Sequence, residues 1–278
     1  MSRQSLNVPA LLREYGLQPK KSLGQNFLVD PNGLEKVIQA AGIGADDTVL
    51  EIGAGLGSLT LLLAQSARRV VAVEIDRNLI PPLTNVLSAY ENVQIVEGDV
   101  LNLPLEELLP DDGYLVVANI PYYISSAIIR RLLEAEKRPA RMVLTVQQEV
   151  AERICARDGK LSLLALSVQV FGAPGIAARI PAGCFYPVPD VDSAVLTIAL
   201  YSQPLIALDA LDAFFKLAHA GFSQKRKTLR NALSAGLGLP AGEIEKLLGT
   251  AEIDPQRRAE TLSIAEWGRL VAAWTFEK

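Results

Sequence analysis

Residues 48–57 read TVLEIGAGLG, an apolar run that ends in an acid and a glycine-rich turn. The run is rich in Val, Leu and Ile, which is typical of a strand covered on both faces of a sheet. Gly53 and Gly55 follow it, and SLTLLLAQSA (58–67) continues with the composition of a helix. Glycines in such a turn let the backbone approach a ligand closely. The stretch therefore predicts the first strand, turn and helix of an α/β fold.

The same alternation continues to about residue 147. Four further runs read RVVAVEID (69–76), VQIVEGD (93–99), YLVVANI (114–120) and RMVLTVQ (141–147). Helical stretches such as SSAIIRRLLEAE (125–136) separate them, so we expect a mostly parallel sheet with right-handed crossovers. Residues 175–201 contain two strand-like runs around a proline-rich loop, which predicts a hairpin that completes the sheet with an antiparallel last strand.

A domain boundary is expected at QPLIALDA (203–210). The apolar spacing beyond it is helical, whereas the spacing before it is that of strands and helices in turn. We therefore expect residues 1–202, with an N-terminal arm at 1–30, to form an α/β domain. Residues 203–278 are expected to form a small all-α domain.

Composition narrows the possible chemistry. His219 is the only histidine, and the only cysteines, Cys155 and Cys184, lack the C-x-x-C spacing of a zinc site. We therefore expect no metal and no Ser-His-Asp catalysis. No apolar stretch is long enough to span a membrane, and the N-terminus lacks the apolar block of a signal peptide, which predicts a cytoplasmic protein without membrane contact.

Three successive strand ends carry ligand-binding residue types. The first ends in Gly53 and Gly55, the second in Glu74 and the third in Asp99. In an open α/β sheet the carboxyl ends of the strands are where ligands bind, and an acid about twenty residues after the glycines commonly binds ribose hydroxyls. The spacing is GxGxG and nothing obvious would hold a pyrophosphate, which favours S-adenosylmethionine (SAM) over NAD. Glu74 would accept from both ribose hydroxyls and Asp99 from the adenine amino group; alternatively, each acid only caps the segment that follows it.

The fourth strand ends in Asn119, Ile120, Pro121 and Tyr122. An exocyclic amino nitrogen of adenine is a poor nucleophile, because its lone pair is delocalised into the ring. The side-chain oxygen of Asn119 and the carbonyl of Ile120 could accept both N–H hydrogens and free that lone pair. Pro121 would stiffen the turn, and Tyr122 could stack on the base, an interaction worth about 1–3 kcal/mol. The pattern predicts catalysis by positioning and hydrogen bonding.

A second aromatic wall for the base is expected from FYPVPDVDSA (185–194). We favour Phe185, and the alternative is that its ring only packs in the core. The neighbouring Tyr123 is expected to be structural. A base held in this way must be unstacked, so the substrate should be single-stranded or flipped.

Charge is unevenly distributed. The net charge is −4, yet residues 213–242 contain no acid. Within that segment, Lys225, Arg226, Lys227 and Arg230 suit contacts with phosphates. A solvated basic helix face is the alternative interpretation of the segment taken alone.

Together these residues resemble one family, the bacterial KsgA-type small-subunit rRNA adenine dimethyltransferases, close relatives of the Erm enzymes. The resemblance covers most of the chain and includes the residues quoted above in the family's order. Further matching segments are KKSLGQNFLVD (20–30), VQQEVAERI (146–154), FYPVPDVDSAV (185–195), FSQKRKTLRNAL (222–233) and IDPQRRAETLSIAEW (253–267). Ile120 stands where leucine is frequent, and only its backbone carbonyl is needed.

The resemblance implies a class I SAM-methyltransferase fold with a Rossmann-like sheet. It implies that Asn26, Leu28, Val100 and Asn119 join the glycines Gly53 and Gly55 and the acids Glu74 and Asp99 at the SAM site. The family's reaction transfers four methyl groups from SAM to two adjacent adenines near the 3′ end of 16S small-subunit rRNA. The expected partners are therefore small-subunit rRNA and the immature 30S subunit, with a role in small-subunit biogenesis. Nothing suggests an obligate partner, so we expect a monomer.

The sequence leaves two alternative functions open. An Erm-like methylase would use the same chemistry on large-subunit rRNA, although the segments 222–233 and 253–267 speak against it. A ribosome-assembly factor could act mainly by binding RNA, although the intact set of Glu74, Asp99 and Asn119 argues against a dead enzyme. A DNA adenine methylase is disfavoured, because no segment looks like a sequence-reading domain.

Overall fold

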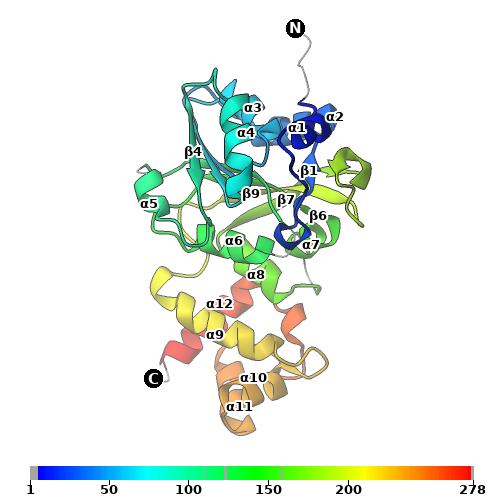
Figure 1. The fold of residues 1–278 in the computed structure, drawn as a ribbon. Coiled ribbons are helices and arrows are strands. Elements are labelled where there is room, and N and C mark those ends of the chain that lie inside the picture. Colours follow the sequence, from blue (N-terminus) through cyan, green and yellow to red (C-terminus); the bar gives the residue numbers. More distant parts are fainter. Residues whose placement is uncertain (1–5, 110, 122–123, 158, 277–278) are drawn as a thin grey trace. The chain divides into compact units, whose positions relative to one another are not determined.

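The computed structural model describes residues 6–109, 111–121, 124–157 and 159–276 (Figure 1). Two compact units divide the described chain. The first contains the residues up to 151 together with 174–200, and the second contains 152–173 together with the residues from 201 onward. The segment 152–173 thus groups with the C-terminal helices, although it precedes the last strands. The division into functional domains at residue 202 stays a prediction.

In the described residues the first unit is built on a seven-stranded sheet. Its strands are β2 (Thr48–Ile52), β3 (Arg69–Glu74), β4 (Val93–Glu97), β5 (Leu115–Asn119), β6 (Arg141–Gln147), β7 (Gly172–Ile180) and β9 (Ser193–Leu200). Their order across the sheet is β4-β3-β2-β5-β6-β9-β7. The neighbours from β4 to β6 are parallel, and β9 runs antiparallel to β6. The predicted mostly parallel sheet with an antiparallel last strand is confirmed.

The strand order reverses beside β2. From β2 the chain adds β3 and then β4 on one side, and it returns to pair β5 on the other side. The carboxyl ends of β2 and β5 therefore flank a topological switch point, which is where ligands bind in open α/β sheets. Both strands end in residues that the sequence predicted to bind ligands.

Helices cover the sheet because its strands are apolar on both faces. The helices α2 (Pro31–Ala41), α3 (Ser58–Ala64) and α4 (Ile80–Val86) share one core cluster with Val49, Val70 and Val117 of the strands. The alternate strand residues Leu50, Val71 and Val116 are also buried, so the other face is covered as well. Further helices of this unit are α1 (Val8–Glu14), α5 (Leu105–Leu108) and α6 (Ser125–Leu133), and α7 (Gln148–Ile154) crosses the division between the units.

A second, two-stranded sheet ties the N-terminal arm to the loop between β7 and β9. Its strands β1 (Phe27–Leu28) and β8 (Phe185–Tyr186) pair in antiparallel fashion, with Leu28 opposite Phe185. This pairing joins segments about 158 positions apart in sequence. It holds the arm against the sheet at the edge that carries the glycine turn.

The second unit is helical, as predicted. It contains α8 (Leu163–Gln169), α9 (Leu211–Phe222), α10 (Leu229–Leu237), α11 (Ala241–Thr250) and α12 (Ile264–Phe276). Trp267 is its fully buried centre, with its ring 6.5 Å from that of Phe214 and 6.0 Å from that of Phe222. The 3₁₀ turns whose bounds lie within the described residues are η1 (Lys21–Leu23), η2 (Arg77–Leu79), η4 (Ala182–Cys184), η5 (Leu208–Ala210) and η6 (Ala259–Thr261). Among the described helices of the chain, none has both the length and the hydropathy needed to cross a membrane.

Candidate functional site

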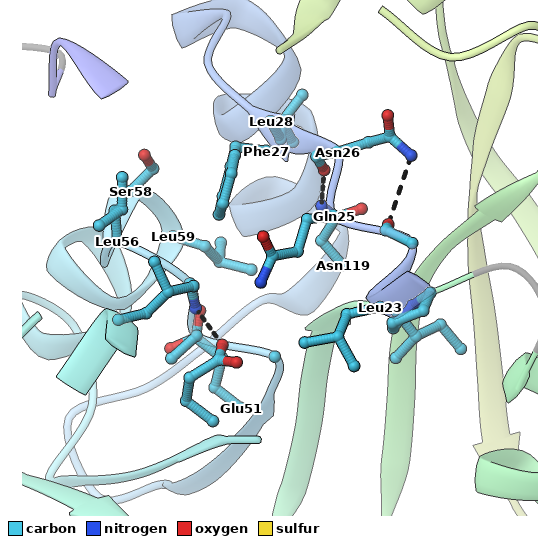
Figure 2. Close-up of a pocket in the computed structure, with 18 of the residues that line it drawn as sticks. Leu23, Gln25, Asn26, Phe27, Leu28, Glu51, Leu56, Ser58, Leu59 and Asn119 are labelled. Carbon is cyan, nitrogen blue, oxygen red and sulfur yellow. Dashed lines mark hydrogen bonds between the residues drawn. The ribbon is translucent and has the colours of Figure 1, made fainter. Parts of the chain in front are cut away.

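A pocket lies at the carboxyl ends of β2, β3 and β5 (Figure 2). One wall is residues 23–28, part of a segment that we call the N-terminal strap (residues 20–28). The other walls are the glycine turn with the start of α3 and the tips of the three strands. Of the residues predicted from the sequence, the pocket brings together Asn26, Leu28, Gly53, Gly55, Glu74, Asn119, Ile120 and Pro121.

The glycine turn needs its glycines for two separate reasons. Gly53 and Gly55 have φ angles of 76° and 59°, in the left-handed region that side chains disfavour. A Cβ on Gly55 would also lie 3.0 Å from two ring carbons of Phe27 in the strap. The turn is therefore shaped both by its own backbone and by the strap that packs against it.

Glu74 is held rigidly at the tip of β3. The side chain is 4% exposed, and its two oxygens accept hydrogen bonds from the backbone N–H groups of Gly55 (2.7 Å) and Asp76 (2.8 Å). Burial raises the pKa of Glu74 above its ordinary value. Because each carboxylate oxygen has two lone pairs, Glu74 can still accept from the hydroxyl groups of a ligand.

Glu51 is a pocket residue that the sequence reasoning did not assign. Its side chain is 1% exposed, and its Oε2 atom has no hydrogen-bond partner among the described residues. Burial, and to a lesser degree the nearby carboxylate of Glu74, raise the pKa of Glu51 to about 8. A buried polar atom without a partner is unusual in a folded protein and often marks a site of function. The sequence did offer one indication of this site, because Glu51 lies at the end of a buried strand, two residues before the glycine turn.

Asn119 is oriented by the strap. Its side-chain Nδ2 donates a hydrogen bond to the backbone carbonyl of Asn26 at 2.9 Å, and Figure 2 shows this bond as a dashed line. The neighbouring Ile120 is 1% exposed, and Pro121 completes this wall of the pocket. Tyr122 and Tyr123 lie outside the described residues, so the expected stacking by Tyr122 and the structural role of Tyr123 stay predictions.

Asp99 and Val100 follow β4 at the same edge of the sheet, but they are not among the residues that line this pocket. Asp99 accepts hydrogen bonds from the backbone N–H of Leu101 (3.0 Å) and from the side chain of Asn102 (2.8 Å). Both bonds belong to a local turn, as in the capping interpretation of this acid. The role of Asp99 towards an adenine amino group stays a prediction.

The role of Phe185 as a second aromatic wall stays a prediction. The ring is 2% exposed and packs in the core cluster that also contains Leu28 and Ile180, and it does not line the pocket. The cause is the pairing of β1 with β8, in which alternate residues face opposite ways and Phe185 lies on the buried side, whereas Tyr186 is 38% exposed. Phe185 thus packs in the core as the alternative interpretation expects, while Leu28 of the same cluster also lines the pocket.

The basic residues of the second unit differ in their surroundings. Lys225, Arg226 and Lys227 are exposed in the turn between α9 and α10. Arg230, in contrast, forms an ion pair with Glu245 at 2.6 Å. The three exposed residues are thus better placed for phosphate contacts than Arg230 is.

The pocket suits a ligand with hydroxyl and amino groups. Gly53 and Gly55 line the pocket without side chains of their own, Glu74 offers acceptors, and the Oε2 atom of Glu51 has no hydrogen-bond partner among the described residues. These features fit SAM. No cluster of three or more metal-ligating side chains occurs in the part of the chain that the structure describes.

The chain is similar to proteins of known identity over almost its whole length. A family model described as ribosomal RNA adenine dimethylase matches residues 16–275. Two similar proteins, both named ribosomal RNA small subunit methyltransferase A, come from Dehalococcoides mccartyi (46% identical, covering 94% of this chain and 90% of the relative) and Moorella thermoacetica (44% identical, covering 94% of each).

Solved structures agree with this similarity. A crystal structure of a dimethyladenosine transferase from Plasmodium falciparum has a TM-score of 0.80 and 27% identity, and the match covers 90% of this chain and 98% of that one. The 23S rRNA methyltransferase ErmE has a TM-score of 0.71 and 28% identity, with 89% and 99% covered.

Proposed function

We propose that this chain, which belongs to the ribosomal RNA adenine dimethylase family, uses SAM to dimethylate the N6 amino groups of two adjacent adenines near the 3′ end of 16S rRNA. Small-subunit rRNA is supported as the substrate because the relatives named small subunit methyltransferase A are 46% and 44% identical to this chain. The 23S rRNA methyltransferase ErmE is 28% identical. The observation that carries the chemistry is the hydrogen bond that fixes the Asn119 amide at the pocket.

The cofactor, when bound, supplies a methyl group on a positively charged sulfur, so the protein needs no metal or histidine to activate the donor. Glu74 is placed to accept from hydroxyl groups, because backbone N–H groups already hold both of its oxygens in one orientation. The glycines at 53 and 55 let the backbone approach the ligand, and Glu51 offers an oxygen whose hydrogen bond is unmade. These residues bind and orient the methyl donor.

Asn119 and Ile120 act on the methyl acceptor. Because Asn119 Nδ2 donates to the carbonyl of Asn26, its Oδ1 is the atom left to accept from the adenine amino group. The Ile120 carbonyl would accept the second N–H hydrogen, and the two bonds would draw the nitrogen towards tetrahedral geometry. Removing one positioned hydrogen-bonding group of this kind from an active site typically lowers the rate by about 10²–10³.

The second unit supplies a surface for RNA. Its exposed residues Lys225, Arg226 and Lys227 can contact phosphates, which would fix the position of the RNA without reading its sequence. We expect the substrate to be an immature 30S subunit, and the protein to act as a monomer in the cytoplasm with a role in small-subunit biogenesis.

Mapping the modified bases tests this function. The protein would be given SAM labelled on its methyl group and, in separate reactions, small subunits that lack the modification, small subunits already dimethylated, and large subunits. We expect label in two adjacent adenines of the unmodified small-subunit rRNA and none in the other two reactions. Label in large-subunit rRNA would favour the Erm-like alternative, and binding without any label would favour an assembly factor.

A further inference from the structure

The N-terminal strap covers the pocket although it has little regular structure of its own. Only a single 3₁₀ turn and two strand residues lie within it. A segment of this kind keeps one conformation only where specific contacts fix it. The contacts that fix the strap converge on one buried carboxylate outside the strap.

That carboxylate belongs to Asp76, whose side chain is 3% exposed. Its Oδ1 accepts from Lys20 Nζ at 2.7 Å, and its Oδ2 accepts from Gln25 Nε2 at 2.9 Å. The Gln25 Oε1 atom in turn accepts from the backbone N–H of Lys20 at 2.7 Å. The three residues form a closed ring, which holds the strap at two points and bridges 51 positions of sequence between Gln25 and Asp76.

Asp76 is ionised in this setting. Burial disfavours its charged form, but the hydrogen bonds from Lys20, from Gln25 and from the backbone N–H of Asn78 outweigh burial and lower the pKa of Asp76 below its ordinary value. A buried charge that loses one partner is strongly destabilised. The ring therefore favours one position of the strap over others.

The ring connects both halves of the proposed chemistry. On one side, the Asp76 backbone N–H donates to Glu74 Oε1 at 2.8 Å, next to the expected cofactor. On the other side, Gln25 immediately precedes Asn26, whose carbonyl accepts from Asn119 Nδ2 at 2.9 Å. If that carbonyl moved away, the Asn119 amide could turn over and present its NH₂ group, a donor, to an amino group that also donates.

We propose that Lys20, Gln25 and Asp76 are positioning residues for methyl transfer. They hold the strap so that the Asn26 carbonyl keeps the Asn119 side chain with its oxygen towards the target amino group. None of the three contacts the target adenine in this scheme, although Gln25 also lies in the wall of the pocket. The inference rests on the proposed function, because it assigns the ring its purpose through Asn119.

A ring that only stabilised the fold would behave differently. Its loss would lower thermal stability, and it would leave the turnover of the remaining folded protein unchanged. A positioning ring has a different signature, in which turnover falls at saturating SAM and the environment of the Asn119 amide changes. The two roles can therefore be separated in one variant.

Gln25→Ala is the decisive variant, because it removes both hydrogen bonds of the Gln25 side chain and leaves the charged pair in place. Gln169→Ala is its matched control, since Gln169 is also half-buried and also makes two hydrogen bonds, to the carbonyls of Ile154 and Ala156 in the second unit. We expect Gln25→Ala to lower kcat about 10- to 100-fold, with a much smaller change in the Kd for SAM. Gln169→Ala should keep the wild-type kcat.

Two further measurements make the test independent of activity. The side-chain amide signal of Asn119 in an NMR spectrum of the ¹⁵N-labelled protein, assigned by its absence in Asn119→Ala, should shift in Gln25→Ala and stay unchanged in Gln169→Ala. Lys20→Arg should retain most of the turnover that Lys20→Met loses, because arginine keeps the charged hydrogen bond to Asp76.

Wild-type kcat in Gln25→Ala, or a lower kcat with an unchanged Asn119 amide signal, would overturn the proposal. A wild-type protein that transfers no methyl group to rRNA would instead contradict the proposed function. In that case the amide signal still decides whether Gln25 positions Asn119.

Discussion

Replacing Glu51 with glutamine should remove much of the pH dependence of the first unit's stability. The pKa of Glu51 is raised from 4.5 to about 8, first by burial and then by Glu74. The unfolded chain therefore loses this proton near pH 4.5, whereas the folded protein retains it until about pH 8. A buried acid with a raised pKa therefore stabilises the folded protein most below pH 4.5. As pH rises from 4.5 to 8, the free energy of unfolding falls by about 1.4 kcal/mol per pH unit. The full interval amounts to roughly 5 kcal/mol, an upper limit because the folded protein can relax around the charge.

Urea unfolding at pH values from 5 to 9 measures this effect. Both tryptophans lie in the second unit, so far-ultraviolet circular dichroism and hydrogen exchange of β2 should be followed instead of fluorescence. As pH rises from 5 to 9, we expect the free energy of unfolding of the wild type to fall by several kcal/mol relative to that of Glu51→Gln. Glu97→Gln, at an exposed position on β4, is the control and should follow the wild-type curve. Parallel curves for wild type and Glu51→Gln would refute the reasoning.

Two other predictions concern the second unit. Replacing Lys225, Arg226 and Lys227 with alanine should weaken RNA binding. The slope of log affinity against log salt concentration should become shallower by about 0.7 for each lost phosphate contact. A filter-binding assay that shows unchanged affinity and slope would contradict RNA docking by this turn. Glu266→Gln should lower stability at neutral pH by about 1–3 kcal/mol, because Glu266 pairs with Arg257 and caps α12. The hydrogen bond from Arg257 chiefly lowers the pKa of Glu266 to about 2, so this contribution is present above pH 4.5 and is lost as pH falls towards 2. Urea unfolding followed by tryptophan fluorescence should show that the stability difference between wild type and Glu266→Gln disappears in acid. A difference that does not depend on pH would contradict the role of the ion pair.

The sheet was predictable because its signal is local. A strand buried on both faces is a nearly continuous apolar run, so TVLEI and LVVAN can be recognised in the sequence even though the first contains Glu51. The strand tips were predictable for the same reason, since Glu74 and Asn119 are the polar residues that end such runs. Parallel pairing then brings both to one edge without any further information.

The contacts that complete the site were not predictable, because they join distant segments through polar side chains. Nothing near Gln25 indicates that it bonds Asp76, and Asp76 could equally have capped the following turn alone. The buried state of Phe185 depends on its pairing with Leu28, and a two-residue strand carries no periodic signal. The grouping of residues 152–173 with the second unit depends on packing with helices that follow much later in the chain.

Asn119→Ala tests the central claim most directly. The variant removes the proposed acceptor of the adenine amino group and leaves Gly55, Glu51 and Glu74 in place. SAM affinity and methyl transfer to unmodified small subunits should both be measured on the same preparation. We predict a Kd for SAM close to that of the wild type and a turnover lower by about 10²–10³. Full turnover in Asn119→Ala would contradict the two-acceptor mechanism.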